Sequence, residues 1–225
     1  MATKFIVATY EAVGGPRVPI KGGDGLTMGP TDQGNYVMAY CGRHTSPTYR
    51  YWSRIPWGAS LKEEKGVLKV FVKGRWQPLR NFTPATKNEI LDRHEALYGV
   101  RKVPPKWVFN DFGHMTCKFF RDKNRNRRLD AGEKIHPEYI HTTPDDEAQS
   151  AMGAPVILVE SHGCVHVKPK DIDEMGKKGY LRAGNSVIVH KYSETAPVAP
   201  VGAGKAPYEV HFFPGSRKIV VKGRK

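Results

Sequence analysis

The first 80 positions of the chain alternate short apolar runs with turn residues. Lys4–Tyr10, Asn35–Tyr40 and Gly66–Val72 carry β-branched and aromatic residues over strand lengths. Gly22–Gly34, between the first two runs, is rich in glycine and polar residues, which favour turns. Gly74–Trp76 turns the chain, so that a following strand pairs with the one before it. The pattern predicts β-strands for the first third of the chain.

One segment of clear helical period follows. Thr86 and Glu89 form a capping-box pattern, after which apolar and ring residues recur three and four positions apart up to Tyr98. Gly99 suits the end of this helix, because glycine tolerates the left-handed conformation found there. A second, shorter helix is predicted over Asp171–Lys177. Three further segments have strand-like patterns: Trp107–Arg121, Val156–Val159 and Ser186–His190.

The last part of the chain differs in composition from the rest. Ser193–Pro207 is rich in proline, alanine and glycine, as linkers are. Val210–Phe213 and Lys218–Val221 flank a Pro-Gly-Ser turn, which predicts a hairpin with a basic tail. We therefore predict a mainly β domain with one or two helices over residues 1–192. Residues 193–225 are predicted to form the linker and a basic C-terminal hairpin.

Composition narrows the class of protein and of partner. The chain has 225 residues, 39% of them hydrophobic, which fits a folded globular protein and excludes a fully disordered one. Its 36 Lys and Arg against 22 Asp and Glu give a net charge of +14, which favours a polyanionic partner such as a cell wall or an anionic surface. No nucleic-acid-binding motif accompanies the charge, and no apolar run is long enough to span a membrane. The N-terminal residues lack the pattern of a secretory signal.

The cysteine count indicates one reactive thiol. Three cysteines occur, and an odd number in a chain of this size does not describe a disulfide scaffold. Cys164 lies in Val159–Val167, which reads Val-Glu-Ser-His-Gly-Cys-Val-His-Val. The other two, Cys41 and Cys117, are left open as either paired or free.

Cys164 has the surroundings of a nucleophile. Gly163 before it permits a sharp turn that aims backbone N–H groups at a substrate carbonyl. A thiol also needs a base, and His141 lies on a separate apolar segment from which the fold can bring it to the thiol. A cysteine and a histidine from different segments are typical of cysteine acyl-transfer enzymes.

These residues resemble the signature of the L,D-transpeptidase catalytic domain, also called the YkuD-type domain. The family has a histidine, a spacer, then Ser/Thr-His-Gly-Cys, an apolar residue and usually an arginine; here the motif reads Ser161 to Val165 after His141. The resemblance covers about residues 1–192 and implies a β-sandwich-like fold. Three features depart from the pattern: His166 replaces the arginine, Thr142 replaces a common glycine, and the spacer is longer. A divergent member is expected, with larger insertions between Arg80 and Arg121.

The resemblance implies a mechanism and a set of roles. Cys164 would attack the third residue of a peptidoglycan tetrapeptide stem, and His141, held by the Thr142 carbonyl, would carry the proton. Amides of His162, Gly163 and Cys164 would form the oxyanion hole. An amine acceptor gives L,D-transpeptidation, and water gives L,D-carboxypeptidation. Substrate contacts are expected from three further residues: Ser161, His166 and Trp57.

The resemblance also bears on where the protein acts and on its partners. Peptidoglycan stem peptides are the expected substrate, so the site of action would be secreted or periplasmic. Without a signal pattern the export route stays open, and deployment as a secreted antibacterial effector, with an immunity or export partner, is compatible with it. No resident cofactor is implied. A basic module that binds cell wall or nucleic acid, with a degenerate site, is the alternative from another class.

Two metal hypotheses remain beside the thiol chemistry. His162, Cys164 and His166 alternate, so together with His141 they offer a set of zinc ligands for a hydrolase, although ligands at alternate strand positions crowd a tetrahedral ion. The segment 122–133 has oxygen ligands at the spacing of an EF-hand loop, but Arg127 takes the place of its glycine. The predicted Ca²⁺ ligands there are Asp122, Asn124, Asn126, Asp130 and Glu133.

Overall fold

The computed structural model describes residues 4–23 and 25–225, which form two compact units. We call the first the barrel unit; it comprises the chain up to residue 41 and residues 117–141 and 158–225. The second, which we call the inserted unit, comprises residues 42–116 and 142–157. Among the described residues, no helix has the length and apolar character needed to cross a membrane.

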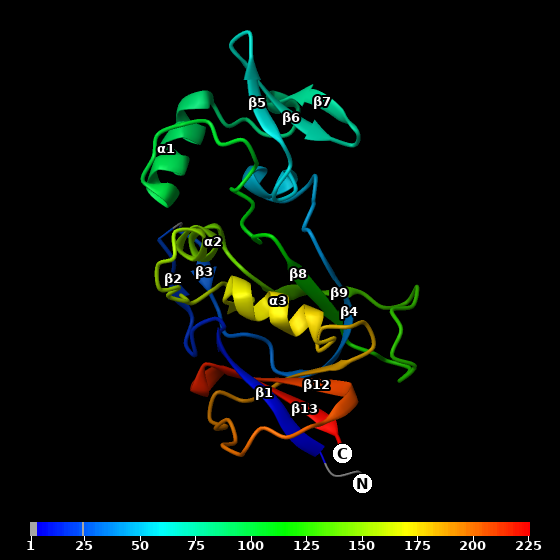
Figure 1. The fold of residues 1–225 in the computed structure, drawn as a ribbon. Helices are drawn as coiled ribbons and strands as arrows, with labels where there is room; N and C mark the ends of the chain where they lie inside the picture. The colour runs from blue at the N-terminus through cyan, green and yellow to red at the C-terminus, as the bar shows by residue number, and fades with distance from the viewer. Residues whose placement is uncertain (1–3, 24) are drawn as a thin grey trace. The chain divides into compact units, whose positions relative to one another are not determined.

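Eight strands of the barrel unit form a closed sheet (Figure 1). Their order around the barrel is β1-β10-β9-β8-β4-β11-β12-β13. The strands are β1 (Lys4–Val13), β4 (Gly34–Gly42), β8 (Thr116–Phe120), β9 (Ile135–His141), β10 (Val165–Val167), β11 (Ser186–Val189), β12 (Lys205–Phe213) and β13 (Lys218–Arg224). Closure leaves no free edge, and alternating side chains of β1 are buried, as expected of a strand with one face on a core. The predicted mainly β fold is confirmed.

The C-terminal hairpin is part of this sheet. β12 and β13 pair antiparallel on either side of the short helix η3 (Pro214–Ser216), and β13 continues along β1 from Lys4↔Arg224 to Glu11↔Lys218. Figure 1 shows the three strands side by side. The predicted hairpin is therefore present, and it completes the barrel rather than forming a unit of its own, since residues 158–225 all belong to the barrel unit.

The remaining elements of the barrel unit are short. A two-stranded ribbon is formed by β2 (Ile20–Lys21) and β3 (Thr27–Met28). The helix α3 (Pro169–Lys177) follows β10, begins at a proline, and buries Ile172 and Met175. It contains the predicted helical segment Asp171–Lys177.

The inserted unit has a core of its own. Its three-stranded antiparallel sheet consists of β5 (Leu61–Glu64), β6 (Val67–Val72) and β7 (Arg75–Pro78). Its helices are η1 (Tyr51–Arg54), η2 (Leu79–Asn81), α1 (Lys87–Tyr98) and α2 (Pro144–Ala151). α1 has the predicted capping box at Thr86 and ends at Gly99 with φ 70°. Fully buried Ile55, Ile90 and Trp107 pack in one apolar cluster of this unit.

Three elements differ from the sequence prediction. Of the predicted strand-like segment Trp107–Arg121, only Thr116–Phe120 forms a strand. Val156–Val159 is not a strand; the segment is irregular, and Ile157 and Val159 are 69% and 59% exposed. A run of apolar residues predicts a buried strand, but no described strand pairs with Val156–Val159 and buries it. The helix α2 was not predicted, although Thr143 and Asp146 form a capping box around Pro144.

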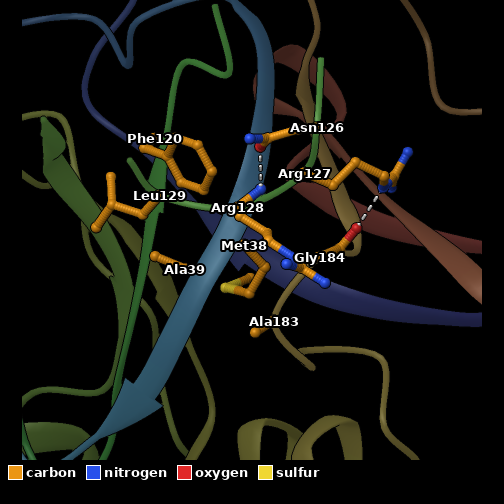
Figure 2. A pocket seen from close by; sticks show the side chains of 9 residues that line it. All are labelled: Met38, Ala39, Phe120, Asn126, Arg127, Arg128, Leu129, Ala183 and Gly184. Atoms are coloured by element: carbon orange, nitrogen blue, oxygen red, sulfur yellow. Dashed lines mark hydrogen bonds between the residues drawn. The ribbon is translucent and has the colours of Figure 1, made fainter. Parts of the chain in front are cut away.

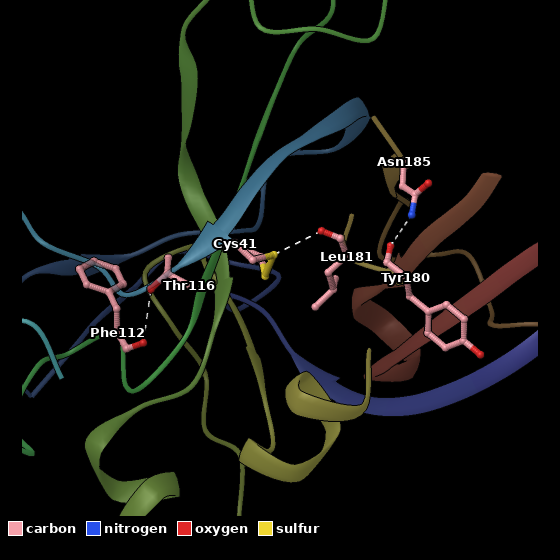
Figure 3. Close-up of a disulfide and its surroundings, with 7 residues drawn as sticks. Cys41, Phe112, Thr116, Tyr180, Leu181 and Asn185 are labelled. Atoms are coloured by element: carbon pink, nitrogen blue, oxygen red, sulfur yellow. Dashed lines mark hydrogen bonds between the residues drawn. A yellow bond between two sulfur atoms is a disulfide. The ribbon is translucent and has the colours of Figure 1, made fainter. Parts of the chain in front are cut away.

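A disulfide joins neighbouring strands β4 and β8 of the barrel unit. Cys41 and Cys117 are bonded, with Cα atoms 4.0 Å apart, and they lie 76 positions apart in sequence (Figure 3). The chain passes from the barrel unit to the inserted unit after Cys41 and returns at Cys117. The pairing that the sequence left open is thus formed, and it closes the base of the 42–116 insertion. Cys164 is the free cysteine.

Candidate active site

Parallel pairing of β9 and β10 places the predicted nucleophile beside the strand that ends in His141. Ile140 pairs with Val165 and His141 with His166, so Cys164, one position earlier, lies level with Tyr139. The Tyr139 N–H donates to Cys164 Sγ over 3.3 Å. Side chains two apart on a strand share a face, and the same register thus directs Tyr139 and His141 to one side of β9.

The turn before Cys164 is held by its own serine. Ser161 Oγ accepts from the Gly163 N–H at 3.0 Å and donates to the Cys164 carbonyl. Gly163 has φ +120°, a conformation available essentially to glycine alone. The Ser161 N–H donates to the Gly14 carbonyl at 3.1 Å, which anchors the turn to the chain that follows β1. Ser161 is buried, so its hydroxyl shapes the turn, and the Gly163 amide already has an acceptor.

Two buried histidines stand side by side at the adjoining register position. The rings of His141 and His166 meet edge to face with centroids 4.8 Å apart. His166 Nδ1 lies 3.0 Å from the Val159 carbonyl oxygen and therefore carries the proton it donates. Burial lowers the pKa of His166 to about 4, so the ring is neutral at pH 7. It does not supply the positive charge of the arginine expected at this position.

The Cys164 thiol is protonated at rest. Desolvation raises its pKa to about 12, the negative charge of Glu138 adds to the rise, and the Tyr139 N–H opposes it. A thiol of this kind reacts only if a base removes its proton as it attacks. Attack by this thiol would therefore need a base beside it, because no thiolate is present at rest.

A carboxylate cluster beside this turn was missed by sequence reasoning. His136 and Glu138 lie two apart on β9, and the Asp32 N–H donates to Glu138 Oε2 at 2.9 Å. His136 Nε2 lies 3.4 Å from Glu138 Oε2 and 3.6 Å from Asp32 Oδ2. One ligand atom from each of the three residues falls within 4.8 Å of the others, a set that could hold a metal ion. In the sequence, the signal for this cluster is His136-Pro-Glu138, upstream of His141, which places a histidine and a carboxylate at alternate positions of one strand.

The predicted Ca²⁺ loop folds around its own side chains. Asn124 and Asn126 each donate Nδ2–H to Asp130 Oδ2 at 2.6 Å, and these bonds lower the pKa of Asp130. Asp122 Oδ2 accepts from the Arg127 N–H, and Glu133 accepts from the N–H groups of residues 123 and 130. Both asparagines would have to turn their amide oxygens inward to bind a cation. Ca²⁺ binding stays a prediction.

The same loop borders a cavity of about 440 Å³ in the barrel unit (Figure 2). Arg127 donates from Nε to the Gly184 carbonyl at 2.7 Å, and the Arg128 N–H donates to Asn126 Oδ1. Met38 of β4 also lines this cavity. The lining contains none of the predicted catalytic residues.

The other predicted site residues fall in different places. His162 is exposed on the turn, next to Gly163 and Cys164. Thr142 is fully buried, belongs to the inserted unit, and donates its hydroxyl to Glu147. Trp57 is half-buried in the inserted unit, and its contact with substrate stays a prediction. The barrel unit thus brings together Ser161, His162, Gly163, Cys164, His141 and His166.

The closed β-barrel presents a free cysteine in a glycine turn, beside a strand that ends in histidine. A family model described as the L,D-transpeptidase catalytic domain (YkuD) matches residues 6–189, more than four-fifths of the chain. The chain belongs to this family. No curated protein and no solved structure matches it.

Proposed function

We propose that the protein is a cysteine acyl-transfer enzyme that cuts and rejoins peptidoglycan tetrapeptide stems, as an L,D-transpeptidase, an L,D-carboxypeptidase or both. The observation that carries the proposal is the free Cys164 thiol, held against β9 by the Tyr139 N–H in the motif Ser-His-Gly-Cys. Membership of the family supports the enzyme class and a cell-wall substrate.

In the proposed first step, His141 accepts the thiol proton as Cys164 Sγ attacks the carbonyl carbon of the third stem residue. The N–H of Cys164 and the neighbouring backbone stabilise the oxyanion; Gly163 contributes only if its bond to Ser161 opens. The C–N bond to the terminal D-alanine then breaks, and His141 returns the proton to the leaving amine. An amine of a second stem attacks the thioester to form a crosslink, or water attacks and leaves a tripeptide.

Mass spectrometry of purified disaccharide-tetrapeptides tests this function. Wild-type protein is expected to give crosslinked dimers or tripeptides, and Cys164→Ala is expected to give neither, because no other group can form the thioester. Chelators should leave the wild-type reaction unchanged. Product formation by Cys164→Ala at the wild-type rate would exclude the thiol mechanism and favour the zinc-hydrolase alternative.

We also propose that the enzyme acts outside the cytoplasm. The Cys41–Cys117 disulfide supports an oxidising compartment, since such bonds are rare in a reducing cytosol. Expression directed to the periplasm is expected to damage the cell wall of a test bacterium, while cytoplasmic expression is harmless. Harm from both routes would contradict this proposal and, with it, deployment as a wall-directed effector.

A further inference from the structure

Glu138 places a negative charge at the reaction centre that nothing in the proposed mechanism uses. Its side chain is 13% exposed, and its carboxylate lies so close to Gly163 that a Cβ added there would overlap Oε1. Gly163 directly precedes the nucleophile. The carboxylate is thus packed against the turn that carries Cys164.

Glu138 is held in place by a backbone N–H and a histidine ring rather than by a lysine or arginine. The Asp32 N–H and the His136 ring hold Oε2, and no lysine or arginine in the described part of the chain forms an ion pair with it. Arg121, which contacts the adjoining Tyr36, donates instead to the Tyr36 hydroxyl and the Gln33 carbonyl. The carboxylate is fixed by a backbone donor and a ring, so its position does not depend on substrate.

A carboxylate with no lysine or arginine partner is unfavourable for the chemistry around it. A thiolate and an oxyanion both form beside it, and like charges at this range destabilise one another. At Cys164, the negative charge of Glu138 contributes to the raised pKa of the thiol. A positively charged group that arrives with the substrate would remove this penalty at the moment the reaction begins.

We propose that Glu138, held by His136 and the Asp32 amide, is a specificity-determining residue that binds an ammonium group of the substrate next to Cys164. This inference rests on the proposed function, whose substrates carry such groups: the side-chain ammonium of a diamino acid in the acyl donor, and the amine of the acyl acceptor. An ammonium paired with Glu138 satisfies the buried carboxylate and eases ionisation of the thiol. Binding of the substrate ammonium and activation of the Cys164 thiol then occur together. If the acceptor is the source, its ammonium first releases one proton to water; the nitrogen then attacks the thioester carbon, the C–S bond breaks, and His141 passes a second proton from that nitrogen to the departing Cys164 sulfur.

Glu138→Gln tests the proposal, because the amide keeps the shape and removes the charge. Wild type is expected to prefer a tetrapeptide donor with a free side-chain amine over the same donor with that amine acetylated, by about 10- to 100-fold in kcat/KM. Glu138→Gln should reduce this preference to near one. Glu174→Gln is the matched control, since Glu174 is an exposed carboxylate of α3 that pairs with Lys178; it should keep the wild-type preference.

Two assay arms distinguish the source of the ammonium. With donor alone and water as acceptor, a changed preference in Glu138→Gln assigns the ammonium to the donor. With the acetylated donor and varied amine acceptors, a raised KM for the acceptor in Glu138→Gln assigns it to the acceptor. A preference that survives Glu138→Gln in both arms overturns the proposal.

A thiol measurement separates failure of this proposal from failure of the proposed function. The pH profile of Cys164 alkylation by iodoacetamide needs no turnover, and Cys164→Ala gives its blank. At about pH 8, where its side chain is an ammonium, adding the amide of Nα-acetyl-lysine is expected to speed alkylation, and so shift the profile to lower pH, in wild type and Glu174→Gln but not in Glu138→Gln. An equal shift in Glu138→Gln, or none in wild type, overturns the proposal even if no stem peptide is turned over. A divalent ion found at one per chain by elemental analysis, lost in Glu138→Gln, would also overturn it in favour of a metal site.

Discussion

Two glycines set how closely the chain approaches the nucleophile. Gly163 lies against Glu138 with a positive φ, and a Cβ on Gly15 would overlap the Gly29 carbonyl and contact the Gly163 nitrogen. Both positions lack room for a side chain, and Gly163 also has a backbone conformation that residues with side chains rarely adopt. The active-site turn therefore depends on segments more than 100 positions away in sequence.

Gly163→Ala is expected to lower kcat/KM at least about 100-fold while the protein stays folded. The methyl group collides with Glu138 and forces φ away from +120°, which moves the amides that face the oxyanion. The measurement is steady-state turnover of the tetrapeptide donor, with circular dichroism to check folding. Gly132→Ala is the control, because a Cβ there meets nothing within 4 Å. Activity of Gly163→Ala within threefold of that control would contradict the prediction.

At the scale of elements, α2 contains a buried carboxylate at its start. Asp146 is 2% exposed, and desolvation raises its pKa to about 6, against the hydrogen bonds from Thr143. Because the folded pKa lies above the unfolded one, the folded state binds the proton more tightly. This carboxylate therefore favours folding at low pH, and that contribution is lost as pH rises from about 4 through about 6.

Asp146→Asn is expected to raise the free energy of unfolding at pH 7 by about 1–2 kcal/mol. The amide oxygen still accepts from the Thr143 N–H, but no charge is buried. Urea denaturation at pH 7 and pH 4 measures the effect, and the gain should shrink at the lower pH, where the wild-type carboxyl is protonated. Asp145→Asn, on the same helix turn, serves as comparison. A loss of stability at pH 7 would show that the helix N-terminus needs the charge.

Elements that carry a local signal could be predicted from the sequence, and those set by tertiary pairing could not. α1 begins at its Thr86 capping box and ends at Gly99, and both are local features. Val156–Val159 has the composition of a strand but no partner to pair with, and pairing is decided elsewhere in the chain. The motif around Cys164 could be predicted from the order and spacing of its residues along the chain. The role of Glu138 could not be predicted, because its proximity to Gly163 follows from the parallel register of β9 and β10.

For the molecule as a whole, the disulfide is the largest single constraint on the unfolded chain. A crosslink between residues 76 apart removes loop entropy worth about 4 kcal/mol in the chain-entropy account. The Cys41→Ala/Cys117→Ala double variant is expected to lower the free energy of unfolding by about 2–4 kcal/mol, measured by urea denaturation. Cys164→Ala in the oxidised protein should change it much less. Equal midpoints for the double variant and the wild type would contradict the prediction.

The position of that disulfide also determines what a protease can achieve. Cys41 and Cys117 stand at the two ends of residues 42–116, so a single cut anywhere between them produces two fragments that remain covalently joined. The nicked protein gains the mass of one water and still migrates as one species until a reductant is added. Digestion inside the insertion would therefore break the covalent connection between the barrel strands before and after it only where thiols are plentiful.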